Sequence, residues 1–205
     1  MTHEESDEAL FAAWCAGSRN AADSLCARYY WRVHRFFELK REREAEDLTQ
    51  RTFLACIERP PAQLGSFRSY LFGIARRLLM RSLRSEYTHA ARRIGMVSDA
   101  SHTRLSGIAA DREEQRLLLR ALTELRSETQ MILALHYWEE MSARQIAEVF
   151  EVSHDAMRSR IVRARDELRV TLDELHSPTA VRESLLSDLQ GWARSVALLE
   201  GRHRA

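Results

Sequence analysis

A run of arginines between residues 154 and 169 has the residue types and spacing to contact nucleic acid. Before it, Ser142 opens a short apolar-periodic stretch that ends at Phe150, and Glu151-Val152-Ser153 separates the two segments. A short capped helix, a tight turn and a second, basic helix form a helix-turn-helix, whose second helix enters the major groove. Arginine suits that helix because its planar fork contacts phosphate or a guanine edge with two hydrogen bonds. The alternative is an arginine-rich helix that faces solvent in a bundle.

A second basic stretch, residues 66–81, interleaves arginines with aromatic residues. Aromatic rings stack on unpaired bases while arginines follow the phosphate backbone, so this composition suits single-stranded nucleic acid. Phe67, Leu71 and Ile74 also have helical spacing, and burial in a core is the default explanation for those three. Residues 68–93 hold seven arginines against one acid, in a chain whose formal net charge is only +1. Such segregation indicates a local surface for a polyanion.

An acidic stretch precedes a third apolar segment. Four acids lie within residues 42–47, ahead of Leu48 and Phe53. The helix macrodipole favours acids in a first helical turn, and this structural explanation is sufficient by itself.

Residues for catalysis or metal binding do not occur in recognisable patterns. The sequence has no glycine-rich phosphate loop, and its eight histidines are scattered. Cys15, Cys26 and Cys56 lack the spacing of a zinc or redox site, which favours three reduced thiols. We therefore expect a protein that is not an enzyme and that needs no metal or cofactor.

The elements that position these segments are expected to be helices. The 205 residues are 45% hydrophobic and include only 7 Gly and 3 Pro, and apolar residues recur at intervals of three and four. This predicts an all-α fold. Serines at four segment starts are candidate N-caps: Ser66, Ser127, Ser142 and Ser153.

The helical segments group into two small domains with an extension. We expect a first domain over 7–93, a linker over 94–111 rich in Gly, Ser and Asp, and a second domain over 112–171. Residues 172–205 form a C-terminal extension. After Pro178 it carries one apolar stripe at helical spacing: Val181, Leu185, Leu189, Trp192, Val196 and Leu199. We expect this amphipathic helix to pack on a domain or to bind a partner.

The sequence also bears on location. No apolar run reaches the length of a membrane span, and the first eight residues are acidic, unlike a signal peptide. We therefore expect a cytoplasmic protein that does not bind membranes.

Taken in order, the three charged segments resemble those of an extracytoplasmic-function (ECF) sigma factor, in the sigma-70 family of bacterial RNA polymerase. Residues 44–53 resemble the acidic D-A-E-D-x-x-Q-x-x-F segment of region 2.2. Residues 67–77 resemble F-R-x-W-L-x-x-I-A-R-N of regions 2.3 and 2.4, with Tyr70 and Arg77 at the Trp and Asn positions. Residues 157–165 resemble the V-K-S-R-L-x-R-A-R end of region 4.2.

This resemblance implies a sigma region 2-like domain, a region 4-like helix-turn-helix domain and a division of labour between them. The acidic segment would bind the clamp helices of core RNA polymerase through Glu44, Glu46, Asp47, Gln50 and Phe53. The basic–aromatic segment would bind the promoter −10 element through Arg68, Tyr70, Arg76, Arg77 and Arg81. The helix-turn-helix would lie near the polymerase flap and read the −35 element through Arg144, His154, Arg158, Ser159, Arg160 and Arg163. An anti-sigma factor, or the chain's own C-terminal helix, could control it.

Two other protein classes remain open from the residues alone. One is a free-standing helix-turn-helix regulator that binds operator DNA without polymerase. The other is an interaction protein, such as a sigma mimic that titrates a regulator. The acidic and basic–aromatic segments argue against the first, because an operator binder has no use for them, and the arginines of 154–169 argue against the second.

Overall fold

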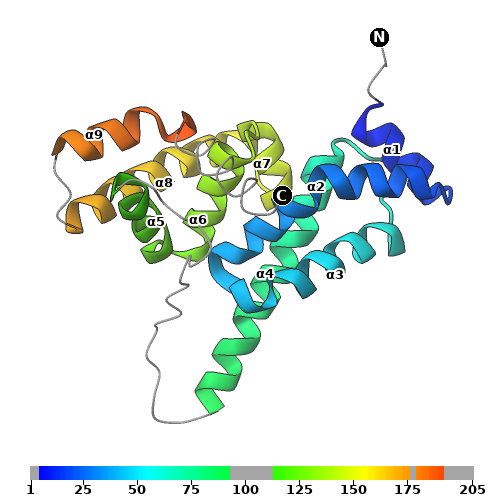
Figure 1. The fold of residues 1–205 in the computed structure, drawn as a ribbon, viewed down its shortest axis with the longest axis horizontal. Coiled ribbons are helices and arrows are strands. Elements are labelled where there is room, and N and C mark those ends of the chain that lie inside the picture. Colours follow the sequence, from blue (N-terminus) through cyan, green and yellow to red (C-terminus); the bar gives the residue numbers. More distant parts are fainter. Residues whose placement is uncertain (1–4, 93–112, 176–178, 192–205) are drawn as a thin grey trace. The chain divides into compact units, whose positions relative to one another are not determined.

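The computed structural model describes residues 5–92, 113–175 and 179–191. Every regular element in these ranges is a helix, which confirms the predicted all-α fold. The chain divides into two compact units, one holding α1–α4 and the other holding most of α5–α9 (Figure 1). The predicted linker over 94–111 lies outside the described residues, as do Trp192, Val196 and Leu199 of the apolar stripe.

The first unit contains α1 (Asp7–Cys15), α2 (Arg19–Arg41), a short 3-10 turn (Glu42–Glu44), α3 (Ala45–Glu58) and α4 (Phe67–Arg92). Serine hydroxyls cap three of these helices, because Ser6, Ser18 and Ser66 accept hydrogen bonds from backbone N–H groups three residues later. The helix α3 ends at Glu58, ahead of Pro60-Pro61, because proline cannot continue a helix.

Aromatic side chains form the centre of this unit. Phe67, the first residue of α4, is fully buried, and its ring centroid lies 5.1 Å from that of Phe11 and 5.5 Å from that of Tyr29. On α3, Thr49 and Thr52 are also fully buried, and each hydroxyl donates to the carbonyl four residues earlier, at 2.6 and 2.7 Å. One face of α3 is thus fixed in the core, so its opposite face is available to solvent.

The second unit contains α5 (Glu113–Glu124), α6 (Ser127–Leu133), a π-helical turn (Ala134–Trp138), α7 (Ala143–Phe150), α8 (His154–Glu174) and α9 (Thr179–Ser187). The prediction that Ser127 caps α6 is wrong. Ser127 is the first residue inside the helix, Arg126 occupies the N-cap position, and no side chain caps this end. Instead, Arg126 and Thr129 both bind Glu167 of α8, at 3.0 and 2.9 Å, which joins the start of α6 to α8.

The C-terminal extension packs on the second unit. The helix α9 lies beside α8 and α5 (Figure 1), and Leu185 and Leu189 are 0% and 3% exposed. The extension is not one continuous helix, because α9 ends at Ser187 and the helical conformation resumes at Leu189. Asp188 sits at this break, and its carboxylate accepts a hydrogen bond from the Gly191 N–H at 2.9 Å, as an N-cap does.

None of the described helices combines the length and the apolar character that crossing a membrane requires.

Candidate nucleic-acid interface

The helix-turn-helix is held together by caps at both of its helices. At α7, the Ser142 hydroxyl accepts from the Gln145 N–H at 3.3 Å, while the Gln145 side chain accepts from the Ser142 N–H at 2.9 Å. This reciprocal pair is a capping box. At α8, the Ser153 hydroxyl accepts from the Ala156 N–H at 3.3 Å. The predicted caps Ser142 and Ser153 are confirmed, so the turn between the two helices is fixed on both sides.

The turn itself demands an unusual backbone conformation. Glu151 has φ +57°, in the left-handed region that glycine adopts most easily. The Val152 N–H donates to the Ala147 carbonyl at 3.0 Å, which closes the end of α7. The turn therefore forms without the glycine that is frequent at this place.

The helix α8 divides into a buried face and an exposed face. Met157, Ala164 and Leu168 are buried in the unit. Most of the residues predicted to contact DNA from this helix-turn-helix are exposed: Arg144, His154, Arg158, Ser159 and Arg163. Because they surround the solvent side of α7 and α8, these side chains can reach one groove of a duplex.

Arg160 differs from this group because it already has a partner. Its guanidinium lies 2.6 Å from the carboxylate of Glu128 on α6, and its side chain is 34% exposed. Position 160 follows Met157 by three residues, which places it at the flank of the buried face rather than on the exposed face. A contact between Arg160 and DNA therefore competes with this ion pair or has to form beside it.

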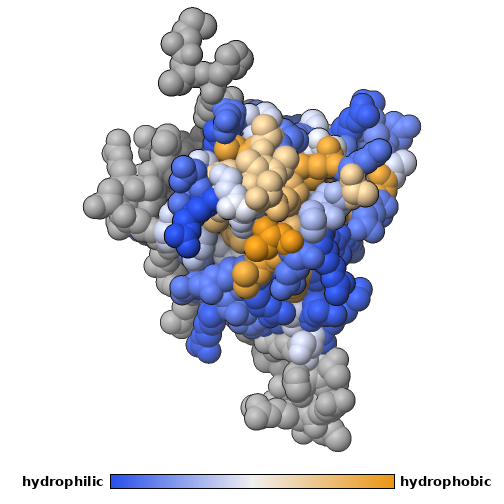
Figure 2. All heavy atoms as spheres, turned by 90° about the vertical axis from the view of Figure 1, so that its right-hand side faces the viewer, coloured by the Kyte–Doolittle hydropathy of each residue, from blue (hydrophilic) through white to orange (hydrophobic). Residues whose placement is uncertain are grey.

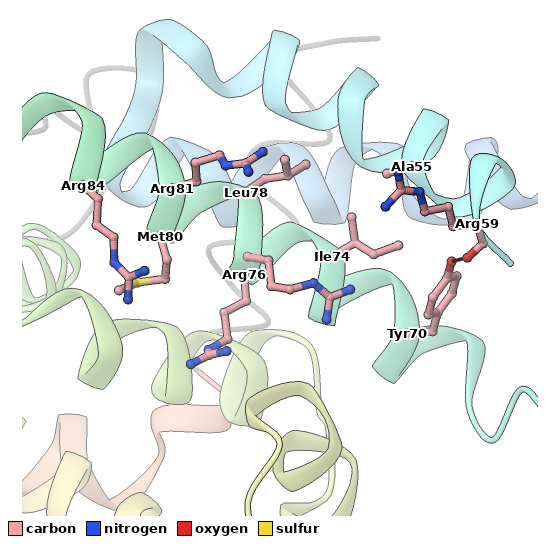
Figure 3. Close-up of a pocket in the computed structure, with 10 residues that line it drawn as sticks. Ala55, Arg59, Tyr70, Ile74, Arg76, Leu78, Met80, Arg81 and Arg84 are labelled. Atoms are coloured by element: carbon pink, nitrogen blue, oxygen red, sulfur yellow. Dashed lines mark hydrogen bonds between the residues drawn. The ribbon is translucent and has the colours of Figure 1, made fainter. Parts of the chain in front are cut away.

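A cationic groove of about 760 Å³ lies in the first unit between the end of α3 and α4 (Figure 3). Four of the predicted −10 contacts line it: Tyr70, Arg76, Arg77 and Arg81. Arg59 and Arg84 line it as well, and the sequence analysis did not select them. Arg84 follows Arg77 and Arg81 at helical spacing and could have been included from the pattern, whereas Arg59 arrives only through the fold. Arg68 is not among the lining residues.

Tyr70 belongs to this groove and also fixes its wall. Its hydroxyl donates to the carbonyls of Cys56 and Arg59, at 3.2 and 2.9 Å. These carbonyls lie at the C-terminal end of α3, where helix carbonyls lack partners within the helix. Burial raises the pKa of Tyr70, so the hydroxyl stays a donor. Tyr70, a predicted DNA contact, thus also has a structural role that its place in the motif does not reveal.

The acidic segment forms the exposed face of α3. Glu46, Asp47 and Gln50 are exposed, and Asp47 pairs with Arg51 one turn later at 3.3 Å. Glu44 is exposed too, and its carboxylate accepts from the Ser82 hydroxyl at 2.7 Å. Phe53 is only 7% exposed, and its ring packs near those of Trp14 and Tyr30. In this structure Phe53 therefore positions α3 and does not present a surface of its own.

The same face of α3 continues with apolar residues. Leu54 and Ile57 are 54% and 39% exposed, and they follow Gln50 by four and seven residues, so they share its side of the helix. Figure 2 shows apolar surface framed by hydrophilic residues on the side of the first unit that carries α1 and α3. Helical spacing alone does not show whether Leu54 and Ile57 face the core or solvent.

No group of three or more His, Cys, Asp or Glu side chains in the described ranges is arranged to hold a metal ion. The three cysteines are free thiols, and burial raises the pKa of Cys56 to about 12.

Two family descriptions match this chain. Sigma-70 region 2 matches residues 24–88, which include the cationic groove and the acidic face of α3. Sigma-70, region 4, matches residues 115–168, which include the helix-turn-helix. Together they span more than half of the chain. The chain belongs to the sigma-70 family.

A solved structure has a similar fold. It is described as "Structure of CnrH in complex with the cytosolic domain of CnrY", and it is similar over 83% of this sigma factor and 99% of that chain. The two share 22% sequence identity with a TM-score of 0.59, which shows a common fold. No curated protein matches this sigma factor.

Family membership decides between the protein classes left open by the residues. A sigma factor directs transcription initiation and is not an enzyme, so both predictions are confirmed. RNA polymerase and promoter DNA are the partners that the family implies. The two matched regions are those implied by the resemblance to the ECF group, and they contain its three motifs.

Proposed function

We propose that this sigma factor divides promoter recognition and polymerase binding among three surfaces of its own. The observation that carries the proposal is that each unit has a separate cationic surface, the groove of region 2 and the exposed face of α8 in region 4. The proposed boundaries are 7–93 for region 2, 112–171 for region 4 and 94–111 for the linker between them.

The groove in region 2 is proposed to bind the −10 element as a single strand. Five arginines give it a positive potential, and Tyr70 and Ile74 contribute apolar surface to its lining. Unpaired bases can stack on such surface while their phosphates meet guanidinium groups. Separating the strands costs unstacking energy, and contacts that exist only for the single strand offset that cost.

The exposed face of α8 is proposed to read the −35 element as a duplex. A recognition helix reads base edges mainly through residues near its N-terminus, and here these include His154, Arg158 and Ser159. Arg144 on α7 and Arg163 in the third turn of α8 are placed for phosphate contacts.

The exposed face of α3 is proposed to bind core RNA polymerase. Its acidic first turn, with Glu46 and Asp47, suits a basic surface, and Leu54 and Ile57 suit an apolar patch two turns further on. Interfaces of this kind combine an apolar anchor with charges that steer and orient the partner. In polymerase terms we place this contact at the clamp helices, and we place region 4 at the flap.

Control by a further protein also belongs to this proposal. CnrH, which has a similar fold, has been solved in complex with the cytosolic domain of CnrY. A comparable anti-sigma partner is proposed here, acting in the cytoplasm where polymerase and promoter DNA are found.

The test is to mix the purified full chain with core RNA polymerase, isolate the complex, and transcribe fragmented genomic DNA. We expect a stoichiometric complex and discrete new start sites whose upstream sequences share a −10 and a −35 element. Binding to core without new start sites would contradict the promoter-reading surfaces, and failure to bind core would contradict the role of α3.

A further inference from the structure

The C-terminal extension adds a helix beyond the residues that match the family's region 4. The region 4 match ends at residue 168, whereas α9 begins at Thr179. The extension nevertheless buries Leu185 and Leu189 against the second unit, on the side formed by α5 and α8. It thus covers part of a domain that has its own core, from Leu118 on α5 to Leu168 on α8.

The extension also engages an arginine of the recognition helix. The guanidinium of Arg165 donates to the carbonyl of Leu186 at 2.8 Å. Leu186 lies in the last turn of α9, where carbonyls lack helical partners and carry the negative end of the helix dipole. A cation at this position stabilises α9, and the same guanidinium is less available to a phosphate.

Arg165 would otherwise belong to the basic side of α8. It follows Arg158 by seven residues and precedes Arg169 by four, so these three arginines lie along one side of the helix. The first of them is a proposed DNA contact. A phosphate backbone that follows this side of α8 would meet Arg165 next.

Two polar contacts of the extension are of a kind that solvent and salt weaken. Arg182 pairs with Asp173, whose side chain is 48% exposed, and the Gln190 amide reaches the Glu140 carboxylate at 3.5 Å. Exposed ion pairs contribute little, and they contribute less as ionic strength rises. Among the described residues that follow Pro178, only Leu185 and Leu189 are buried, so detachment of α9 has a modest cost.

We propose that α9 is an autoinhibitory element that competes with DNA phosphate for Arg165. When α9 is docked, Arg165 caps the extension and region 4 has a weaker hold on DNA. When α9 detaches, Arg165 joins Arg158 and Arg169 and adds one phosphate contact. This inference rests on the proposed DNA-binding role of α8. The experiment uses different variants to test the role of α9 and the DNA-binding role of α8.

The experiment compares the full chain with a chain that stops after His176, in binding to a mixed-sequence duplex of about two helical turns. A labelled duplex of this kind reports phosphate contacts without knowledge of the promoter. We expect truncation to tighten binding several-fold and to steepen the dependence of log K on log salt by about one, as one added phosphate contact requires. Combining truncation with Arg165→Gln should return the slope to that of the full chain.

Arg163→Gln is the matched control, because Arg163 is an exposed arginine of α8 whose guanidinium donates to the Ser159 carbonyl in its own helix. We expect it to weaken binding in both chain lengths, with the effect of truncation preserved. The autoinhibitory role is overturned if truncation leaves the affinity and the salt slope unchanged. It is also overturned if truncation still steepens the salt slope in a chain that carries Arg165→Gln. If Arg163→Gln has no effect in either chain, the proposed DNA-binding face of α8 is wrong and the inference fails with it.

Truncation also uncovers the surface beneath α9, so a second variant keeps the chain intact. Leu185→Ser with Leu189→Ser should detach α9 and steepen the salt dependence as truncation does. Circular dichroism melting identifies any variant in which region 4 has unfolded. A folded double variant with the binding of the full chain would overturn the proposal.

Discussion

Two glutamates in region 4 occupy backbone conformations that usually favour glycine. Glu140 has φ +50° and Glu151 has φ +57°. A residue with a Cβ pays steric energy there, on the order of 1–2 kcal/mol in regular left-handed backbone. We expect Glu151→Gly to preserve or raise stability by up to about 1 kcal/mol, and Glu151→Val to lower it because a β-branched side chain fits this region worst. Thermal melts that show the two variants to be equally stable would contradict this account.

Glu167 links the folding of region 4 to pH. Its carboxylate accepts hydrogen bonds from Arg126 and Thr129, and the Arg126 hydrogen bond lowers the pKa of Glu167 below its ordinary value. A carboxyl whose folded pKa is depressed adds stability above its unfolded pKa, about 4.3, and loses it as the pH falls through the folded value. We therefore expect Glu167→Gln to cost about 0.5–1 kcal/mol at neutral pH and to cost progressively less below pH ~4.

Hydrogen exchange at the amides of α6 and α8 measures this effect within the full chain. Glu148→Gln, at an exposed position of α7, is the control for loss of one negative charge. A Glu167→Gln penalty that stays constant down to acidic pH would show that the carboxylate is not the source of the stability.

Arg160 is expected to act in promoter reading although it is paired with Glu128. Arg160→Ala should weaken −35 binding of the holoenzyme by about 1–3 kcal/mol if the arginine contacts a base edge. Glu128→Gln separates the two roles, because it removes the pair and leaves the guanidinium free for DNA. We expect this second variant to bind as well as the unmodified protein or better. Normal transcription by Arg160→Ala from the factor's own promoter would remove Arg160 from the reading surface.

The helix α3 acts as one unit with a buried and an exposed face, and its two kinds of exposed residue can be tested apart. Asp47→Arg should slow association with core polymerase and make it less sensitive to salt, because charge steers the encounter. Leu54→Ser should mainly speed dissociation, because an apolar anchor contributes to the formed interface. Both positions are exposed, so both variants should keep the fold, with only a small decrease in melting temperature for Asp47→Arg from the lost ion pair and helix-dipole interaction.

Surface-captured core polymerase and the two variants in solution would give both rates. Arg51→Ala, which breaks the exposed pair with Asp47, is the control for loss of the pair itself. Equal rates for Leu54→Ser and the unmodified protein would place the polymerase contact elsewhere.

Across the whole chain, the two proposed DNA surfaces lie on separate compact units. Two weak sites bind one duplex tightly only when their separation is held at the right value, because the effective concentration of the second site depends on the linker. We expect the free protein to bind promoter duplex weakly and core polymerase to increase that affinity by orders of magnitude. Tight, sequence-specific binding by the free protein, measured at matched salt, would contradict a division of reading between the units.

The sequence predicted those features of this sigma factor that depend on local chemistry. Helical periodicity gives the elements, and serine caps such as Ser142 and Ser153 give two of their boundaries, because both signals act within one helical turn. What it missed depends on contacts between distant segments. Arg59 enters the groove because the fold places the end of α3 beside Tyr70 of α4, and the Glu128 partner of Arg160 comes from another helix.

The burial of single residues is the second feature that the sequence does not determine. Phe53 and Leu54 are adjacent in a motif, yet one is 7% exposed and the other 54%, since neighbouring helical positions point about 100° apart. A pattern of apolar residues identifies a helix that packs, but the partner helices decide which of them face the core.

The buried threonines of α3 limit how this sigma factor can be modified. Thr49 and Thr52 lie in the motif beside the acidic polymerase-binding face, where an added phosphate would change the charge of that face. Both side chains are fully buried, and both hydroxyls already donate to helix carbonyls. A protein kinase could reach either hydroxyl only after α3 had unwound locally. A phosphomimetic Thr49→Glu substitution would therefore report the unfolding of α3 and not the state of a regulatory switch.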